Sequence, residues 1–220
     1  MSSHHIVRDD QEPALIIANG ASCNPELLGQ LLEWSPLVIV LDSAMVRVME
    51  LDIKVDVLLG DFDRGFDPEI YKTSQYPLEI VHTPDQNKTD LEKAFDYLIN
   101  RKIPAVNVVW ATGKRADHTI TNLTNIPKYR NLLKIVILDD HSKVFLLPRK
   151  FEKWYTAQTP ISLIPIGQVT GIQSDNLFYP LQNDTLTIGY RTGSSNHVAQ
   201  DGLVTILHEE GDLLLMECLD

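Results

Sequence analysis

Short apolar runs alternate with helix-like patterns over the first two thirds of the chain. Each run ends at turn or polar residues, and the runs cover 14–18, 37–41, 55–59, 78–81, 106–110 and 135–138. Between several of them, apolar residues recur at helical spacing, as in the stretches 27–32, 45–51 and 91–98. Strands that alternate with helices predict βαβ units with right-handed crossovers. We therefore expect an open, mostly parallel α/β sheet.

The pattern changes after Pro148. From Thr159 onward the segments are short and rich in Val, Ile and Thr, and no helical period is visible. Turn signals interrupt them at 165–167, 182–184, 193–194 and 210–211. The sequence predicts two domains, an α/β domain over residues 1–147 and a small antiparallel β-sandwich domain over residues 148–220. The charged stretch 149–153 is the predicted linker.

The composition is that of a globular protein. Of the 220 residues, 44% are apolar and 22% are charged, which is enough for a core and for at most two modest domains. Neither a run of the ~18 apolar residues that a membrane helix needs nor a signal-peptide pattern occurs, so we expect a cytoplasmic protein without membrane association. The net charge of −11 opposes binding along nucleic acid. Cys23 and Cys218 lack metal-site spacing and should be reduced thiols.

Three polar clusters each follow an apolar run, and the carboxyl ends of parallel strands are where open α/β sheets bind ligands. In the first cluster, Asp61 and Asp63 flank Phe62 after the run 55–59. If the backbone stayed extended there, the two carboxylates would face the same way and would repel each other without a cation between them. A turn cap by Asp61 beside a solvated Asp63 would also explain this cluster. Asp42, at the end of a neighbouring predicted strand, favours a Mg²⁺ site.

The second cluster, residues 83–90, combines turn residues with a predicted helix start at Thr89. A surface loop followed by a helix is a sufficient explanation of it. In the functional interpretation, Lys88 binds a phosphate, Asp90 binds the metal and Gln86 forms a hydrogen bond with a neutral polar group of the substrate. The cluster therefore supports a site only together with the first one.

The third cluster follows the run 106–110 and lacks the spacing of a Walker A motif, so it is not a P-loop. Gly113 lets backbone N–H groups approach an anion, and Arg115 can bind that anion with two hydrogen bonds. Asp117 and His118 lie beside them. For His118, a helix-capping or packing role and a catalytic role are equally compatible with the sequence.

The β domain offers no site on chemistry alone. Residues 193–197 are most simply interpreted as a turn between strands. Tyr179 and Trp154 are expected to be core or interface aromatics.

Taken in order, these residues resemble the thiamine pyrophosphokinase family. Residues 60–63 are similar to the family's GDFDS, and residues 83–90 are similar to its TPDQxxTD. Residues 111–122 are similar to GATGGRxDHxxxN. Further counterparts lie in the β domain at 163–167, 177–181 and 195–196. Six motifs in the same order cover most of the chain and are hard to ascribe to chance.

The resemblance implies a homodimer that transfers the β,γ-diphosphate of ATP to the hydroxyl of thiamine, giving thiamine diphosphate and AMP, with Mg²⁺ required. It implies that the metal-binding and catalytic residues are Asp61, Asp63 and Asp90. The chemistry of the transfer adds the hypothesis that a carboxylate near the metal, Asp61 or Asp63, accepts the hydroxyl proton. The implied nucleotide-binding residues are Asp42, Lys88, Gly113, Lys114, Arg115, Asp117 and His118. The residues implied to border thiamine are Gln86, Tyr179, Ser195 and Asn196.

The chain departs from the family pattern at several glycines. Ser43 and Ala44 stand where the family often has two glycines, and Trp110 and Lys114 each replace another. Loss of these glycines narrows the approach of the backbone to phosphate, whereas Lys114 adds a positive charge. Two alternatives therefore stay open. One is an ATP-dependent kinase or pyrophosphokinase of another heterocyclic alcohol, and the other is a nucleotide- or thiamine-binding regulatory module without turnover.

Overall fold

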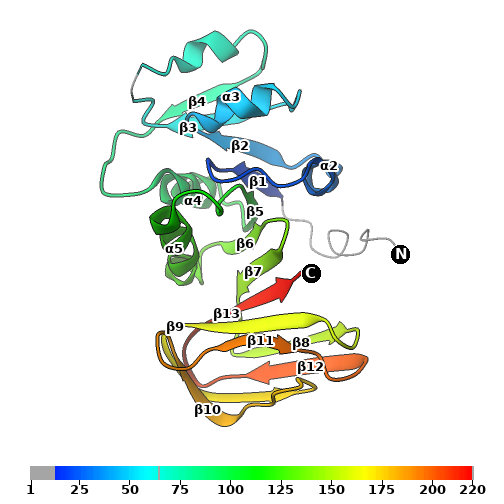
Figure 1. The fold of residues 1–220 in the computed structure, drawn as a ribbon. Coiled ribbons are helices and arrows are strands. Elements are labelled where there is room, and N and C mark those ends of the chain that lie inside the picture. Colours follow the sequence, from blue (N-terminus) through cyan, green and yellow to red (C-terminus); the bar gives the residue numbers. More distant parts are fainter. Residues whose placement is uncertain (1–12, 64, 220) are drawn as a thin grey trace. The chain divides into compact units, whose positions relative to one another are not determined.

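A computed structural model describes residues 13–63 and 65–219, and the chain forms two compact units (Figure 1). The first unit runs up to Asn125 and includes Tyr129–Asp139, and the second comprises Ile126–Lys128 and the chain from Asp140 onward. The first twelve residues of the predicted α/β domain lie outside the described residues. The expected combination of an α/β unit with an antiparallel β unit is confirmed.

The first unit is built on a parallel sheet with the strand order β4-β3-β2-β1-β5-β6. Its strands are β1 (Ala14–Ile17), β2 (Leu37–Leu41), β3 (Val57–Gly60), β4 (Glu79–His82), β5 (Ala105–Val109) and β6 (Lys134–Leu138). Every ladder between neighbours is parallel. β1, β3 and β5 are buried along their whole length, as expected for parallel strands covered on both faces.

The strand order reverses between β1 and β5. From β1 the chain moves outward through β2, β3 and β4, and it then returns to the other side of β1 to form β5. In open α/β sheets, ligands bind outside the carboxyl ends of the strands at such a reversal. The segments that follow β1 and β5 therefore occupy the expected ligand position.

Helices connect the strands of this unit. The α-helices are α2 (Pro25–Leu32), α3 (Ala44–Met49), α4 (Asp90–Asn100) and α5 (Ala116–Thr124), and the 3₁₀ turn η1 (Pro68–Tyr71) follows β3. A second 3₁₀ turn, η2 (Ile126–Tyr129), belongs mostly to the second unit. The predicted start of α4 is confirmed, because Thr89 and Glu92 form a reciprocal capping box there. α4 packs on β2 and β3 and buries Phe95. The predicted helix 45–51 is shorter, since α3 ends at Met49 and Leu51 is exposed.

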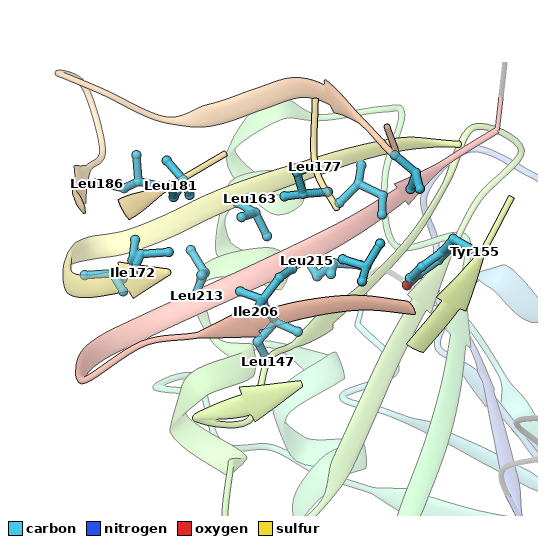
Figure 2. Close-up of a cluster of buried hydrophobic side chains, with 14 residues drawn as sticks. Leu147, Tyr155, Leu163, Ile172, Leu177, Leu181, Leu186, Ile206, Leu213 and Leu215 are labelled. Carbon is cyan, nitrogen blue, oxygen red and sulfur yellow. The ribbon is translucent and has the colours of Figure 1, made fainter. Parts of the chain in front are cut away.

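The second unit contains antiparallel ladders. Its strands are β7 (Ser142–Leu146), β8 (Lys150–Tyr155), β9 (Pro160–Asp175), β10 (Gln182–Thr187), β11 (Gly193–His197), β12 (Gly202–Leu207) and β13 (Glu210–Cys218). The first part of β9 pairs with β11, its last part pairs with β12, and β10 and β13 pair along it. β9 thus belongs to both layers of the sandwich, which encloses a separate apolar core. Figure 2 shows Leu163 of β9, Leu186 of β10, Ile206 of β12 and Leu215 of β13 within that core.

Several predicted turns and the predicted linker are wrong. Residues 149–153 mostly belong to β8, whose alternating charged and apolar residues pair in register with β12. Residues 165–167 lie inside β9, and residues 182–184 and 193–197 lie in β10 and β11. Gly167, Asn183 and Ser195 have positive φ near register irregularities. Residues that tolerate positive φ also suit β-bulges, so the same local signal arises inside a strand.

Candidate functional site

Asp42 follows β2 directly and has a positive φ of 45°. Its N–H donates to the carbonyl of Leu59 in β3 at 2.8 Å. Gly60 makes this approach possible, because a Cβ at that position would lie 3.0 Å from the Cβ of Asp42. The sequence thus brings the Asp42 carboxylate against the carboxyl end of β3.

The charge environment of Asp42 is acidic. Burial raises the pKa of its carboxyl group, the N–H of Ser43 opposes this effect, and the carboxylates of Asp90 and Asp61 raise the pKa further. The Oδ1 atom of Asp42 is buried, and the described residues provide it with no hydrogen-bond partner. Neighbouring carboxylates that disfavour one another's charge are arranged as expected for a site that takes a cation.

Asp61 and Asp63 lie in a bent segment rather than an extended one. Phe62 has a φ of 54°, so the backbone does not stay extended there, and the argument that an extended segment would turn both carboxylates the same way does not apply. Asp61 Oδ2 accepts a hydrogen bond from Gln86 Nε2 at 3.2 Å, and Asp61 Oδ1 accepts one from the N–H of Asp63 at 3.4 Å. His82 Nε2 lies 3.1 Å from the carbonyl oxygen of Asp61. These contacts fix Asp61 beside Gln86.

Oxygen donors of this kind suit Mg²⁺, which prefers carboxylates and keeps several of its waters. Within residues 13–63 and 65–219, no three acidic, His or Cys side chains already stand at metal-binding distances from one another. Asp90 and Asp61 nevertheless raise the pKa of Asp42, whose buried Oδ1 has no hydrogen-bond partner among the described residues. Both features fit a divalent cation that is also bound by waters or phosphate oxygens. The residues present are therefore compatible with Mg²⁺.

The start of α4 carries two ion pairs. Lys88 Nζ lies 2.6 Å from Asp96 Oδ2, and this hydrogen bond raises the pKa of Lys88. Lys93 Nζ lies 3.1 Å from Asp90 Oδ1, and the side chain of Lys93 is almost fully buried. Lys93 was not predicted from the sequence. Its position one helical turn after Asp90 was the available signal for this ion pair.

The loop after β5 leads into α5. Gly113 has a φ of 86°, and a Cβ there would collide with the Cβ of Ala21. Arg115 forms a two-pronged ion pair with Asp117, in which Nε donates to Oδ1 at 3.0 Å and Nη2 donates to Oδ2. This pairing lowers the pKa of Asp117 to about 2. Asp117 Oδ1 also accepts a hydrogen bond from the N–H of His118 at 2.9 Å. Within the third polar cluster, Arg115 is therefore paired with Asp117 in this state.

Arg47 of α3, which the sequence analysis did not name, contacts the segments at the expected ligand position. Its guanidinium binds the segment after β1 and lies 4.4 Å from the ring centroid of Trp110. Burial lowers the pKa of Arg47, and burial together with Arg47 lowers the pKa of Lys114. The signal in the sequence was a lone cation in an otherwise apolar helix shortly after Asp42.

In the second unit, Asn196 is 5% exposed and its amide is engaged by the backbone of Tyr179. Asn196 Oδ1 accepts from Tyr179 N at 3.0 Å, and Nδ2 donates to Tyr179 O at 2.8 Å. Ser195 has a positive φ, and its N–H donates to Ser162 Oγ at 3.0 Å. Tyr179 and Trp154 are both largely exposed, so they do not lie in the core of the single chain, and the alternative that they are interface aromatics stays a prediction.

An open parallel sheet with carboxylates at its carboxyl edge, followed by an antiparallel β unit, defines a class of two-unit α/β protein whose candidate ligand site is lined by acidic residues. Family profiles identify the class further. The profile described as "Thiamin pyrophosphokinase, catalytic domain" matches residues 28–137, which is half of the chain, and "Thiamin pyrophosphokinase, vitamin B1 binding domain" matches residues 150–211. The chain belongs to the thiamine pyrophosphokinase family, as the sequence motifs indicated.

Individual relatives agree with this assignment. The chain is 28% identical to "Thiamine pyrophosphokinase 3" of Oryza sativa subsp. japonica over 73% of its own length and 65% of the relative. It is 30% identical to "Thiamine pyrophosphokinase 1" of the same organism over 67% of its own length and 61% of the relative. The chain thus spans less than two thirds of these two relatives. The crystal structure of thiamine pyrophosphokinase from Bacillus subtilis shares the fold, with a TM-score of 0.77 and 24% identity over 94% of this chain and 99% of that one.

Proposed function

We propose that this chain is a thiamine diphosphokinase that transfers the diphosphate group of ATP to thiamine. The observation that carries the proposal is the buried Asp42 Oδ1, which has no hydrogen-bond partner among the described residues, in a carboxyl group whose pKa Asp90 and Asp61 raise. Membership of the thiamine pyrophosphokinase family supports the choice of substrates. The acceptor would be the hydroxyl oxygen of thiamine, and the second product would be AMP.

The acidic residues would bind the metal. Asp61, Asp63 and Asp90 would hold Mg²⁺, with Asp42 beside them. The bound cation would neutralise charge on the transferred phosphates, which is the main requirement of phosphoryl transfer. The described part of the chain provides oxygen donors of the right chemistry, and Asp42 Oδ1 is buried there without a partner.

The protein's own groups would orient the reactants. Gln86, held on Asp61 at 3.2 Å, would place the hydroxyethyl end of thiamine next to a carboxylate. Asp61 or Asp63 would accept the hydroxyl proton as the oxygen attacks the β-phosphorus of ATP. A new bond forms between that oxygen and the β-phosphorus, while the bond from the β-phosphorus to the oxygen shared with the α-phosphate breaks. The leaving AMP keeps the shared oxygen on its α-phosphate. The main task of the site is therefore to hold the thiamine oxygen in line with the bond that breaks.

The loop after β5 would bind the nucleotide. Gly113 and Lys114 would meet phosphate with backbone N–H groups and an ammonium, and Arg115, Asp117 and His118 would border the nucleotide. Because Lys88 and Arg115 are paired with Asp96 and Asp117, binding of phosphate by either cation would require it to exchange its partner.

The second unit carries further residues that we assign to thiamine binding. We propose a cytoplasmic homodimer in which Tyr179 and Ser195 border thiamine. Asn196 would act by holding Tyr179, since its amide is engaged by the backbone of that residue on both sides. Tyr179 is 61% exposed in the single chain and so is available as an aromatic wall.

The role of Asp61 is tested by Asp61→Asn. The purified protein is incubated with ATP, Mg²⁺ and thiamine, and AMP and thiamine diphosphate are quantified by chromatography. We expect the variant to lose about a hundredfold or more in rate, as for removal of a general base. Asp67→Asn is the matched control, because Asp67 lies in the same loop and its cap on the N–H of Glu69 survives in Asn. A nearly normal rate in folded Asp61→Asn would contradict the proposal.

A further inference from the structure

Two backbone segments meet where the strand order reverses. The segment 19–22 follows β1, and the segment 110–114 follows β5. Gly20 N donates to the carbonyl of Trp110 at 2.5 Å, and Ala21 N donates to the carbonyl of Thr112 at 2.7 Å. A Cβ at Gly20 would overlap both carbonyl oxygens. The two segments are thus packed backbone to backbone at the expected ligand position.

Arg47 ties these segments to α3. Its Nη1 donates to Ser22 Oγ at 3.0 Å, and its Nη2 donates to Asn19 Oδ1 at 3.0 Å and to the carbonyl of Gly20 at 2.9 Å. The same guanidinium lies on the ring of Trp110, 4.4 Å from its centroid. One side chain therefore contacts the segment after β1 through hydrogen bonds and the segment after β5 through a cation–π contact.

We propose that Arg47 is a positioning residue for the nucleotide, which clamps the segments 19–22 and 110–114 together so that Lys114 and the backbone of Gly113 meet the phosphates in a fixed geometry. This inference rests on the proposed function and deepens its nucleotide side. A flat guanidinium that donates along its edge and stacks on its face can hold both segments at once. Lysine has neither the fork nor the flat face, so it cannot substitute.

Trp110 provides the aromatic face on which Arg47 lies. It stands where the family often has glycine, and its φ of 56° is a conformation that a bulky residue adopts only at a cost. Such strain persists where the surroundings determine the conformation. Trp110 is 1% exposed, and its ring is covered by Arg47. The contact with Arg47 is therefore part of the surroundings that hold Trp110 in this conformation.

The charge of Arg47 remains available to an anion. The groups that accept its hydrogen bonds in the described part of the chain are a hydroxyl, an amide oxygen and a carbonyl oxygen, all of them neutral. Burial lowers the pKa of Lys114, and the positive charge of Arg47 lowers it further. Residues 13–63 and 65–219 show no carboxylate paired with both Arg47 and Lys114, and two neighbouring cations of this kind favour a polyphosphate over a neutral ligand.

The test compares Arg47→Lys with Arg101→Lys in the full chain. Arg101 is the matched control, because it also stacks on an aromatic ring, that of Tyr97, at 4.9 Å, but pairs with Glu79 at the amino end of β4. The Michaelis constant for ATP and kcat are measured at saturating thiamine. Backbone amide exchange at Gly20 and Ala21 is followed by NMR, with the buried strand residue Ile16 as the internal reference.

For Arg47→Lys we expect the KM for ATP to rise about tenfold with a smaller change in kcat, the size expected for losing a hydrogen bond from a charged donor. The amides of Gly20 and Ala21 should exchange faster, while the amide of Ile16 and the melting temperature stay as in the wild type. Arg101→Lys should match the wild type in every measurement. Unchanged ATP affinity together with unchanged exchange at Gly20 and Ala21 in Arg47→Lys would overturn the proposal.

Two additions keep the test decisive. If Arg47→Lys does not fold, Ser22→Ala removes one acceptor of the clamp at an exposed position, and it should give the same changes at smaller size. If the wild type forms no AMP, the proposed function fails, and the clamp is then judged by calorimetric titration with ATP and by amide exchange. Weaker ATP binding and faster exchange in the variants would support the clamp, and wild-type values for both would refute it.

Discussion

Three residues with positive φ mark the carboxyl edge of the parallel sheet. Asp42, Phe62 and Trp110 follow β2, β3 and β5, and each adopts a left-handed conformation that non-glycine residues seldom take. The sharp bend after each strand turns the chain so that the following polar groups gather at one edge. Strained backbone of this kind clusters at functional sites because the surrounding fold compensates its cost.

The first prediction concerns Asp42. In metal-free protein at pH 7, Asp42→Asn should raise the free energy of unfolding by roughly 0.5–1 kcal/mol, because it removes a partly buried charge that Asp90 and Asp61 repel. The same variant should lower AMP formation about tenfold or more, as is typical of residues that support a metal site. Chemical denaturation in EDTA and the product assay measure the two effects.

Asp52→Asn is the matched control for Asp42→Asn. Asp52 also has a positive φ, of 54°, but it is exposed in the turn after α3. Any gain that comes only from the better fit of Asn to a left-handed conformation should appear in both variants. Equal stabilisation by both substitutions, with unchanged AMP formation, would show that Asp42 has no special charge environment.

At the level of elements, short-range sequence patterns predicted the features that depend on short-range contacts, such as the start of a helix. The capping residue Thr89 and the apolar spacing of Leu91, Phe95 and Leu98 predicted α4, and the helix begins there. The strand β9 was not predicted as one continuous strand, because Gly167 was interpreted as a turn residue. Its course through residues 160–175 is determined by pairing with β11 and β13, which lie far away in the sequence.

The second prediction concerns the capping box of α4. Thr89→Ala should lower the free energy of unfolding by about 1 kcal/mol, since the Thr89 Oγ1 atom accepts the N–H of Glu92 and Glu92 in return accepts the N–H of Thr89. Thr89→Ser keeps the hydroxyl and should lie close to the wild type. Urea denaturation of both variants provides the comparison, and equal losses in Ala and Ser would contradict a capping role.

The third prediction concerns pH and the connection between β12 and β13. His208 is almost fully buried, and its Nδ1 lies 2.9 Å from Arg149 Nη1. Burial and the charge of Arg149 lower the pKa of His208, against smaller opposing effects that include Asp212. The folded state therefore binds a proton less readily than the unfolded state does. Stability from this group is present above the unfolded pKa of about 6.5 and is lost as the pH falls through it.

We therefore expect the free energy of unfolding to decrease between pH 7 and pH 5, and to decrease less in His208→Gln. Gln retains an oxygen that can accept the hydrogen bond from Arg149 but does not titrate. Urea denaturation at several pH values measures both proteins. Parallel pH dependence in wild type and variant would show that His208 does not contribute.

At the level of the whole molecule, the sequence predicted the fold better than it predicted the ion pairs and hydrogen bonds of the candidate site. Alternation of apolar runs indicated an α/β unit followed by a β unit, and no helix in the described ranges 13–63 and 65–219 has the length and apolar character to cross a membrane. The motifs also led to Asp42, Asp61 and Asp90. The pairing of Lys88 with Asp96 and the contacts of Arg47 depend on tertiary distances that no local pattern encodes.

The central claim is that a diphosphate group moves intact from ATP to thiamine. The most direct measurement uses ATP labelled at the γ-phosphate, with Mg²⁺, thiamine and the purified chain, followed by chromatographic separation of all products. The account predicts that the label appears in thiamine diphosphate together with an equal amount of AMP. Label in thiamine monophosphate with ADP as the partner product, or no labelled thiamine product although ATP binds, would contradict it.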